Sequence, residues 1–372
     1  MLDRTDRSLI GIWWWTVDRW LLSIVLVLMA LGTILVMAAS PPVAVRIGLP
    51  EQHFVWRQLI FLLPALCLMF FFSLISPRQI RVISLFGLSA AIGLMLTTAI
   101  IGNEINGAAR WLSLGPLRIQ PSEFAKPFFA IICAWLLTIW RDGEEFPGWI
   151  WATSLAAILV FILVLQPDIG MTLLIALTWG FQMFLAGMPM LLVLTIIALA
   201  PLCLYAAYLF LPHVESRIDR FFDGGTMQTT KSIESFSQGG FFGVGPGDGQ
   251  VKLNLPDAHA DFIFSVAAEE YGVLACLFLI GLYCFFLLRG FERSASGPSL
   301  FNLLAGAGLI MQFAVQASIH MASSVNLIPA KGMTLPLISY GGSSLVASSI
   351  TVGMILALTR DNRYMIGTDD DN

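Results

Sequence analysis

Two carboxylates and an imidazole lie close together just before a long apolar stretch. Residues 255–270 read LPDAHADFIFSVAAEE, with Asp257, His259 and Asp261 inside five positions. Such a group of ionisable side chains is unusual in a chain that is mostly apolar. We take it as the first candidate site.

The residues around this cluster predict where it lies relative to the membrane. Pro256 suits the first turn of a helix, where its missing N–H costs nothing, so Asp257 and Asp261 are expected one turn apart on one face. The strictly apolar part, 271–288, is about 27 Å long at about 1.5 Å per residue. Asp261 is therefore expected near the lipid headgroups, within reach of the polar head of a lipid-borne substrate. The alternative is that acidic residues only stabilise the helix start, which accounts for Asp257 but not for nearby cations.

The elements that must position these side chains are membrane-spanning helices. The chain has 372 residues, of which 57% are hydrophobic and 12% charged, far from the composition of a soluble domain. Runs of about 20 apolar residues, each long enough to cross a bilayer as a helix, lie at 18–39, 54–75, 80–101, 122–140, 148–166, 169–187, 189–211, 262–289, 301–322 and 338–359. We expect an all-α integral membrane protein with about ten transmembrane helices.

One long segment, 212–261, separates the seventh and eighth expected helices. Its glycine-rich part lacks the lysine of a P-loop and the strand–helix setting of a dinucleotide-binding motif. Nothing in it indicates a separately folded domain. We therefore expect residues 1–372 to form a single polytopic membrane domain, with 212–261 as an extracytoplasmic loop.

Basic residues predict the orientation. An even number of helices places both termini on one side, and ten arginines in the tails and short loops of that side face six basic residues opposite. Because cytoplasmic loops carry the excess of Lys and Arg, we expect both termini in the cytoplasm. The net charge of −4 makes nucleic acid an improbable partner.

Cations on the predicted outer side oppose this general tendency. All four lysines and all four histidines fall there, so an anionic ligand is one explanation and solvated loop charges are the other. Arg110, Lys126 and Lys331 are the candidate cations. Glu123 and Lys126 lie three residues apart and are expected to pair on one helical face.

Two further polar features lie at membrane depth. Asp168, within QPDIG, is either functional, as ionisable groups in membranes often are, or the N-cap of a helix. Gln312, Gln316 and His320 follow one another at four-residue intervals and form a stripe suited to hydrogen bonds between helices. The Gly- and Pro-rich segment 326–344 predicts non-helical backbone buried in protein or lining a cavity.

Six motifs together resemble the SEDS family of bacterial cell-wall polymerases. They read NGAARW, QPSEFAK, QPDIG, GGFFGVGPG, LPDAHADFIF with EEYG, and IPAKGMTLPLISYGGSS. They span residues 106 to 344, and their order and spacing agree with that family. The last motif looks more like the division branch, FtsW, than the elongation branch, RodA.

The resemblance implies a peptidoglycan glycosyltransferase that polymerises lipid II at the division septum of the bacterial cytoplasmic membrane. Asp261 would be the general base toward the acceptor hydroxyl, Asp257 a supporting charge, and undecaprenyl pyrophosphate the leaving group. A divalent cation, Mg²⁺ or Mn²⁺, is a candidate cofactor. Implied partners are a class B penicillin-binding protein and other divisome membrane proteins. Implied substrate-binding residues are Arg110, Glu123, Lys126, Asp168, Gln228, His259, Lys331 and Ser343.

Three alternatives remain open at this point. An elongation-type polymerase would share the same site. A lipid II flippase would need charges along a path to the cytoplasmic face, whereas the ionisable motifs cluster on one face. A non-catalytic scaffold would not need both a carboxylate and cations around one cavity.

Overall fold

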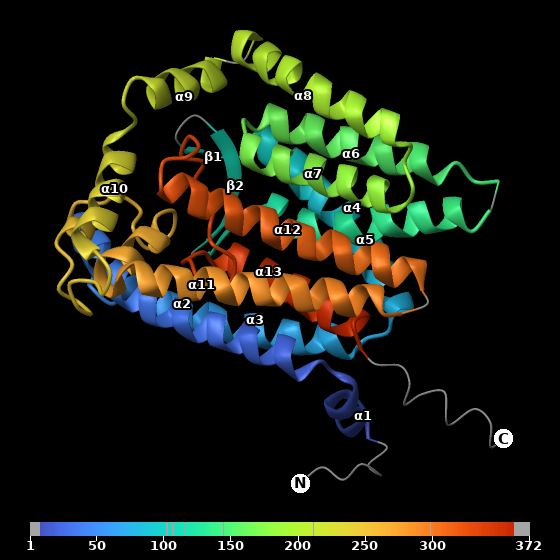
Figure 1. The fold of residues 1–372 in the computed structure, drawn as a ribbon, viewed down its shortest axis with the longest axis horizontal. Coiled ribbons are helices and arrows are strands. Elements are labelled where there is room, and N and C mark those ends of the chain that lie inside the picture. The colour runs from blue at the N-terminus through green and yellow to red at the C-terminus, as the bar shows by residue number, and fades with distance from the viewer. Residues whose placement is uncertain are drawn as a thin grey trace.

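A computed structural model shows a mostly helical protein (Figure 1). It describes residues 8–360 except 102, 106, 107, 116, 144, 211 and 298. The helices are α1 (Leu9–Thr16), α2 (Arg19–Arg46), α3 (His53–Leu74), α4 (Pro77–Ile101), α5 (Pro121–Arg141), α6 (Gly148–Leu165), α7 (Ile169–Leu185), α8 (Met190–Phe210), α9 (Pro212–Phe222), α10 (Met227–Gly239), α11 (Ile263–Ala295), α12 (Leu300–Ser324) and α13 (Gly342–Leu358). A single 3₁₀ turn, η1 (Val251–Leu253), precedes α11.

Each of the ten predicted apolar runs coincides with one helix, so the helical membrane fold is confirmed. Within the described residues, seven helices are long and apolar enough to cross a membrane, namely α2, α3, α4, α5, α6, α11 and α12. The helices α7 and α13 are apolar but shorter, with 17 residues each. The number of ten crossings stays a prediction.

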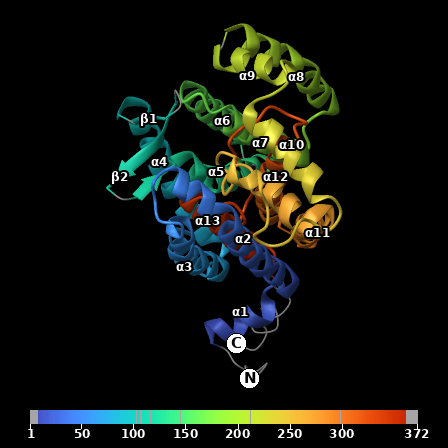
Figure 2. The same ribbon diagram turned by 90° about the vertical axis from the view of Figure 1, so that its left-hand side faces the viewer.

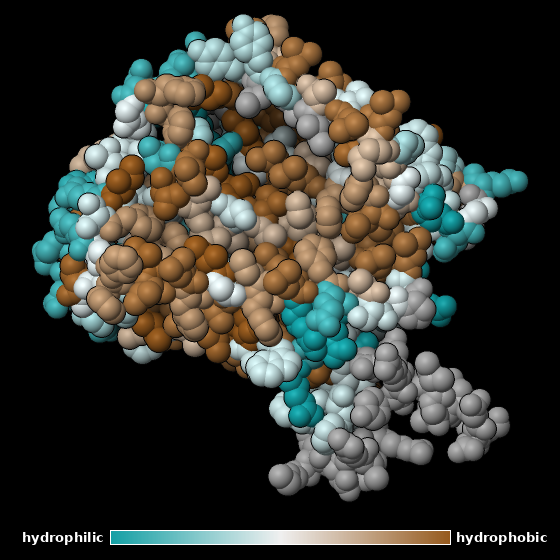
Figure 3. All heavy atoms as spheres, viewed as in Figure 1, coloured by the Kyte–Doolittle hydropathy of each residue, from teal (hydrophilic) through white to brown (hydrophobic). Residues whose placement is uncertain are grey.

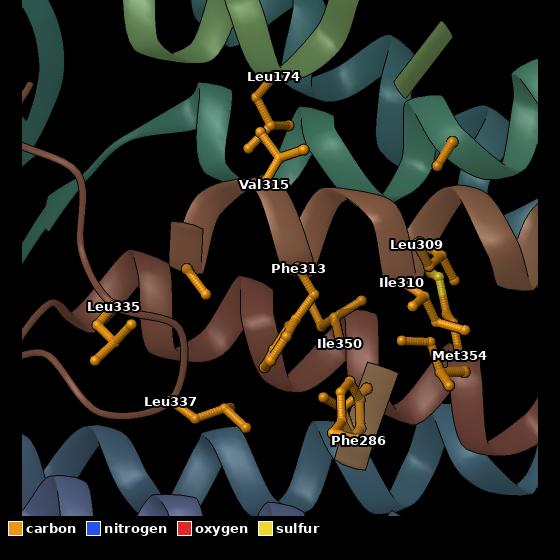
Figure 4. Packing of buried hydrophobic residues seen from close by; sticks show 14 of the residues in the cluster. Leu174, Phe286, Leu309, Ile310, Phe313, Val315, Leu335, Leu337, Ile350 and Met354 are labelled. Atoms are coloured by element: carbon orange, nitrogen blue, oxygen red, sulfur yellow. The ribbon is translucent and has the colours of Figure 1, made fainter. Parts of the chain in front are cut away.

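The core of the bundle is built around α5 and α12, the most buried of these seven helices. Phe313 of α12 and Phe286 of α11 lie 4.9 Å apart between ring centroids, close to Ile350 of α13 (Figure 4). Leu335 and Leu337, from the connection between α12 and α13, fill the end of this core. The connection is therefore packed protein, as its Gly- and Pro-rich sequence predicted.

The two ends of the helix bundle carry different elements. The chain enters the bundle through α1 at the end where α13 finishes, whereas α9, α10 and the small sheet lie at the opposite end (Figure 1). The helix α8 lies at the edge of the bundle and, with α9, stands apart from the remaining helices (Figure 2). The helix α9 then leads the chain back to α10.

Two segments differ from the sequence-based expectation. Three short strands between α4 and α5, β1 (Asn103–Ile105), β2 (Ala108–Leu114) and β3 (Leu117–Ile119), form a small antiparallel sheet. The 212–261 segment, expected as a loop, contains α9, α10 and η1, and its extracytoplasmic location stays a prediction.

Candidate active site

Asp261 lies in a turn rather than in the helix expected from Pro256. The helix α11 begins only at Ile263, so the predicted helix start was wrong. The reason is Asp257, whose φ of 50° belongs to the left-handed region and cannot continue a helix. The N–H of Asp261 still donates to the carbonyl of Asp257 at 2.9 Å, so a tight turn holds the two carboxylates near each other. We call residues 256–262 the Asp261 turn.

The connection between α12 and α13 holds this turn through main-chain atoms. The Tyr340 N–H donates to the His259 carbonyl at 2.9 Å, and the Ser339 hydroxyl donates to the Ala260 carbonyl at 2.6 Å. Gly332 of the same connection has φ of 61°, and a Cβ placed there would lie 3.3 Å from Oδ2 of Asp261. The Asp261 carboxylate therefore faces the backbone next to Lys331.

The Asp261 carboxylate differs from the other acidic groups near it. Glu269 accepts from the backbone N–H groups of Val251 and Lys252 at 2.6 and 3.0 Å, whereas Asp261 makes no side-chain hydrogen bond or ion pair with any described residue. Burial, together with the negative charge of Asp257, raises the pKa of Asp261 to about 7. Asp257 itself is exposed. Among the acidic residues that the structure describes, Asp261 therefore combines partial burial with an unpaired carboxylate.

The His259 side chain packs against aromatic rings next to the Asp261 turn. Its ring centroid lies 4.4 Å from that of Phe54 and 5.0 Å from that of Tyr340. His259 is 5% exposed, and burial lowers the pKa of its ring to about 4. Its Nδ1 has no hydrogen-bond partner among the described residues. A neutral imidazole in an aromatic cluster fits a packing role beside Asp261 better than contact with an anionic group.

A second group of charged side chains lies at the start of α7, around Asp168 and Arg110. Asp168 is the N-cap of α7, accepts from Met171 N–H at 3.3 Å, and lies 3.8 Å from Nε of Arg110. The N-cap reading of Asp168 is therefore confirmed, and its functional role stays a prediction. Arg110 also donates to the carbonyls of Gln166 and Pro167, which fixes its guanidinium next to the start of α7.

Two more cations belong to this group. Burial and the charge of Arg217 lower the pKa of Lys331, while Asp168 opposes the shift. Burial and the charge of Arg110 likewise lower the pKa of Arg217. Three cations thus lie within electrostatic range of Asp168, with Glu123 as a second carboxylate within that range. The positive charge near the start of α7 suits an anionic ligand. We call Arg110, Arg217 and Lys331 the cation cluster.

Lys126 and Glu123 are not part of this cluster. Both are 5% exposed, and Nζ of Lys126 donates to Glu123 and to Gln316 at 2.7 Å each. Gln316 in turn donates to the carbonyl of Thr334 at 3.0 Å. The expected Glu123–Lys126 pair is confirmed, and its position inside the bundle favours a structural role.

The polar stripe of α12 makes the predicted hydrogen bonds to its neighbours. Gln312 donates to the carbonyl of Lys126 at 2.8 Å, and Nδ1 of His320 lies 2.7 Å from the carbonyl of Met333. The bonds of His320 to Met333 and of Gln316 to Thr334 fix the backbone of 333–334, immediately after Lys331 and Gly332. The stripe therefore sets the position of Lys331 relative to Asp261.

The remaining sequence candidates lie elsewhere. The Ser343 hydroxyl accepts from the Gln120 N–H at 3.1 Å and so joins α13 to α5. Gln228 lies in the first turn of α10 and is half-buried. Sequence reasoning missed Arg217, although α9 is strongly amphipathic, with Val214, Ile218 and Phe221 on one face.

The chain itself offers little for a metal ion. Among the described residues, no three His, Cys, Asp or Glu side chains cluster in a way that would hold one. A divalent ion here would have to take most of its ligands from substrate phosphates and water, as Mg²⁺ often does. The predicted cation stays untested.

Comparison with known proteins gives the family. A family model described as "Cell cycle protein", for FtsW, RodA and SpoVE, matches residues 19–364. The probable peptidoglycan glycosyltransferase FtsW of Caulobacter vibrioides (strain NA1000 / CB15N) is 42% identical over 361 residues, covering 96% of this chain and 93% of that protein. The protein of the same name from Legionella pneumophila is 32% identical over 366 residues, covering 93% and 92%.

Two solved structures share the fold. One, described as "Structural coordination of polymerization and crosslinking by a peptidoglycan synthase complex", has a chain with a TM-score of 0.78 and 28% identity, covering 92% of this chain and 97% of that one. The crystal structure of the Thermus thermophilus rod shape determining protein RodA has a TM-score of 0.70 and 28% identity, covering 94% and 99%. With a family model that matches nearly the whole length, this chain belongs to the FtsW/RodA/SpoVE family.

Proposed function

We propose that this chain is a peptidoglycan glycosyltransferase that polymerises lipid II during septal wall synthesis, with Asp261 as the general base. The observation that carries the proposal is the unpaired, partly buried Asp261 carboxylate, held against Gly332 beside Lys331. A base with a pKa near the working pH is effective in proton transfer. The names of the relatives support the reaction class.

The reaction divides between the carboxylate and the cation cluster. The Asp261 carboxylate takes the proton from the 4-hydroxyl of the acceptor lipid II sugar. The oxygen of that hydroxyl forms a bond to C1 of the donor glycan. The bond from C1 to the pyrophosphate oxygen breaks, and its electron pair leaves with undecaprenyl pyrophosphate.

The cation cluster stabilises the leaving group. Negative charge grows on the pyrophosphate as the bond to C1 breaks, and fixed cations act where that charge develops. Lys331 is next in sequence to Gly332, which faces Asp261, and it also lies within electrostatic range of Asp168 and Arg217. Its backbone therefore lies next to the residue that faces the base, and its ammonium group belongs to the cation cluster. Lys126 is left out of this role because Glu123 and Gln316 already occupy its ammonium group.

The setting of the enzyme follows from the family. It is a multi-pass protein of the bacterial inner membrane, and we propose that it acts at the septum with both termini in the cytoplasm. A class B penicillin-binding protein is the proposed partner, because a similar fold occurs in a complex described as coordinating polymerization and crosslinking. That partner would crosslink the strands made here.

The test compares two carboxamide variants of the purified protein, assayed with its transpeptidase partner on lipid II. Asp261→Asn keeps the shape of the side chain and removes the base, so glycan-strand synthesis should fall by about 10²-fold or more. Asp257→Asn is the matched control and should lose far less, because Asp257 is exposed and one turn away. Near-normal synthesis by Asp261→Asn, or equal losses in both variants, would overturn the assignment.

The division role has its own test. Depletion in a cell that relies on this chain should give filaments with blocked septa. Rounded cells that still divide would instead place the protein in the elongation branch. A flippase would differ from both, since Asp261→Asn would then abolish transfer of lipid II across proteoliposome membranes rather than strand synthesis.

A further inference from the structure

The glycine-rich loop after α10 packs against α11 at a break in that helix. Gly272 has φ of 77° and ψ of −177°, which no helical residue adopts. The break leaves backbone groups of α11 without their usual partners. The loop, residues 239–247, supplies replacements.

Four backbone hydrogen bonds join the loop to the break. Before it, Val244 and Gly245 donate to the carbonyls of Glu269 and Glu270 at 2.9 and 3.1 Å. After it, Val273 and Leu274 donate to the carbonyls of Gly240 and Phe241 at 2.9 and 3.3 Å. The loop is therefore fixed to α11 on both sides of Gly272.

The contact is too close for side chains. A Cβ at Gly239 would clash with the carbonyl of Ala268, and a Cβ at Gly243 with that of Glu270. At Gly272 it would clash with the carbonyl of Phe241. Only glycine fits at these three positions, so the backbone of the loop lies directly against the backbone of α11. This close contact leaves no room between them for larger side chains.

The loop also carries exposed side chains that are large and apolar. Phe241 is 73% exposed and Phe242 is 82% exposed, with Val244 beside them at 41%. Residues 239–247 carry no charged side chain. A rigid loop that presents two adjacent phenyl rings to its surroundings is poorly suited to water.

The neighbouring surface of α11 identifies what surrounds these rings. Leu274, Leu277 and Phe278 follow the break and are exposed on a helix long and apolar enough to span the membrane. Leu274 is the residue whose N–H bonds to Phe241. Apolar side chains dominate the surface over α11, whereas hydrophilic side chains gather at the left edge of the view, beside α10 (Figure 3). The two rings therefore extend a surface that faces lipid.

We propose that Phe241 and Phe242 insert into the bilayer interface beside α11 and anchor the 212–261 segment to the membrane. The break at Gly272 lies where the strictly apolar part of α11 begins, so the loop sits at the level where headgroups give way to acyl chains. Aromatic side chains are favoured at this level. The occupant of this face is the lipid itself.

Site-directed spin labelling tests the proposal. A nitroxide is attached to cysteine at position 242 in a full-length variant without the five native cysteines, reconstituted in vesicles of phosphatidylethanolamine and phosphatidylglycerol. Collision rates with oxygen, which concentrates in the bilayer, and with Ni-EDDA, which stays in water, are then measured. Phe278→Cys serves as the lipid-facing control, and Gln250→Cys, exposed and beyond the uncharged stretch, as the aqueous control.

The label at 242 should show an oxygen-to-Ni-EDDA ratio severalfold above that at 250 and close to that at 278. A ratio like that at 250 would show that the loop stands in water and would overturn the proposal. Low accessibility to both reagents would also overturn it, since a second copy of the chain would then cover the rings. A label at 241 repeats the test at a second position, so that one perturbed site does not decide the outcome.

Discussion

Removing the Asp257 charge should move the pH profile of the enzyme without removing its activity. Asp257 is the carboxylate whose negative charge helps to raise the pKa of Asp261 to about 7. Asparagine tolerates the left-handed backbone of that position, so Asp257→Asn should keep the Asp261 turn. The pKa of Asp261 should then fall. It should stay above its ordinary value, since burial is the larger cause and is unchanged.

The size of the effect follows from the fraction of Asp261 that is ionised. With a pKa of about 7, about half of the base is active at pH 7, about a tenth at pH 6 and about a hundredth at pH 5. A base works only when deprotonated, so kcat/KM should rise with pH and level off above pH 7. In Asp257→Asn the same rise should occur at lower pH, and the variant should retain a larger share of its plateau activity at pH 6.

The assay is the initial rate of lipid II consumption at low substrate concentration, where the acid limb reports the free enzyme. Asp248→Asn is the matched control, because Asp248 is an exposed carboxylate of the same segment and is not among the causes of the raised Asp261 pKa. Its profile should match that of the parent protein. An acid limb that stays in place or moves to higher pH in Asp257→Asn would refute the reasoning.

Three further outcomes are expected. First, Asp261 has a raised pKa in the folded state, so the folded protein loses stability as pH rises from about 4 to about 7, by up to about 4 kcal/mol. Thermal melts should therefore show Asp261→Asn more stable than the parent at pH 8 and equal to it near pH 4. Lys331→Gln and Arg217→Gln should raise the KM for lipid II with unchanged melting temperature, whereas Lys126→Gln should lower stability by about 3–5 kcal/mol because it leaves Glu123 buried and unpaired; the reverse pattern would return Lys126 to the substrate site. A cysteine at Asp223, an exposed position after α9, should react with an impermeant thiol reagent in intact spheroplasts, and labelling only after permeabilisation would contradict the topology.

The helices were predictable because a segment that crosses a membrane has a long run of apolar residues. An apolar run of about 20 residues has few alternatives to a helix when water is absent, and each such run here is a helix. The Glu123–Lys126 pair was equally predictable, since it depends on the spacing of two residues within one helix. Asp168 as an N-cap followed from the proline before it.

Features that depend on distant contacts or on one backbone angle were not predictable. Pro256 is compatible with a helix start, and only the left-handed conformation of Asp257, which the sequence does not show, ends that possibility. Arg217 comes within electrostatic range of Arg110 and Lys331 through the path that the chain takes between α8 and α10, and its own neighbours in sequence do not show this. His259 looked like a ligand in sequence, yet its surroundings are Phe54 and Tyr340.

The dependence of the Asp261 turn on the α12–α13 connection has a consequence for synthesis of the protein. Asp261 leaves the ribosome about 70 residues before Lys331 and Gly332, and α12 must enter the membrane between them. Until then the turn lacks the hydrogen bonds from Ser339 and Tyr340. A nascent chain can therefore insert most of its helices before Ser339 and Tyr340 hold the Asp261 turn in place. The enzyme becomes competent only when the last loop is in place, so premature termination inside α12 should yield an inserted but inactive protein.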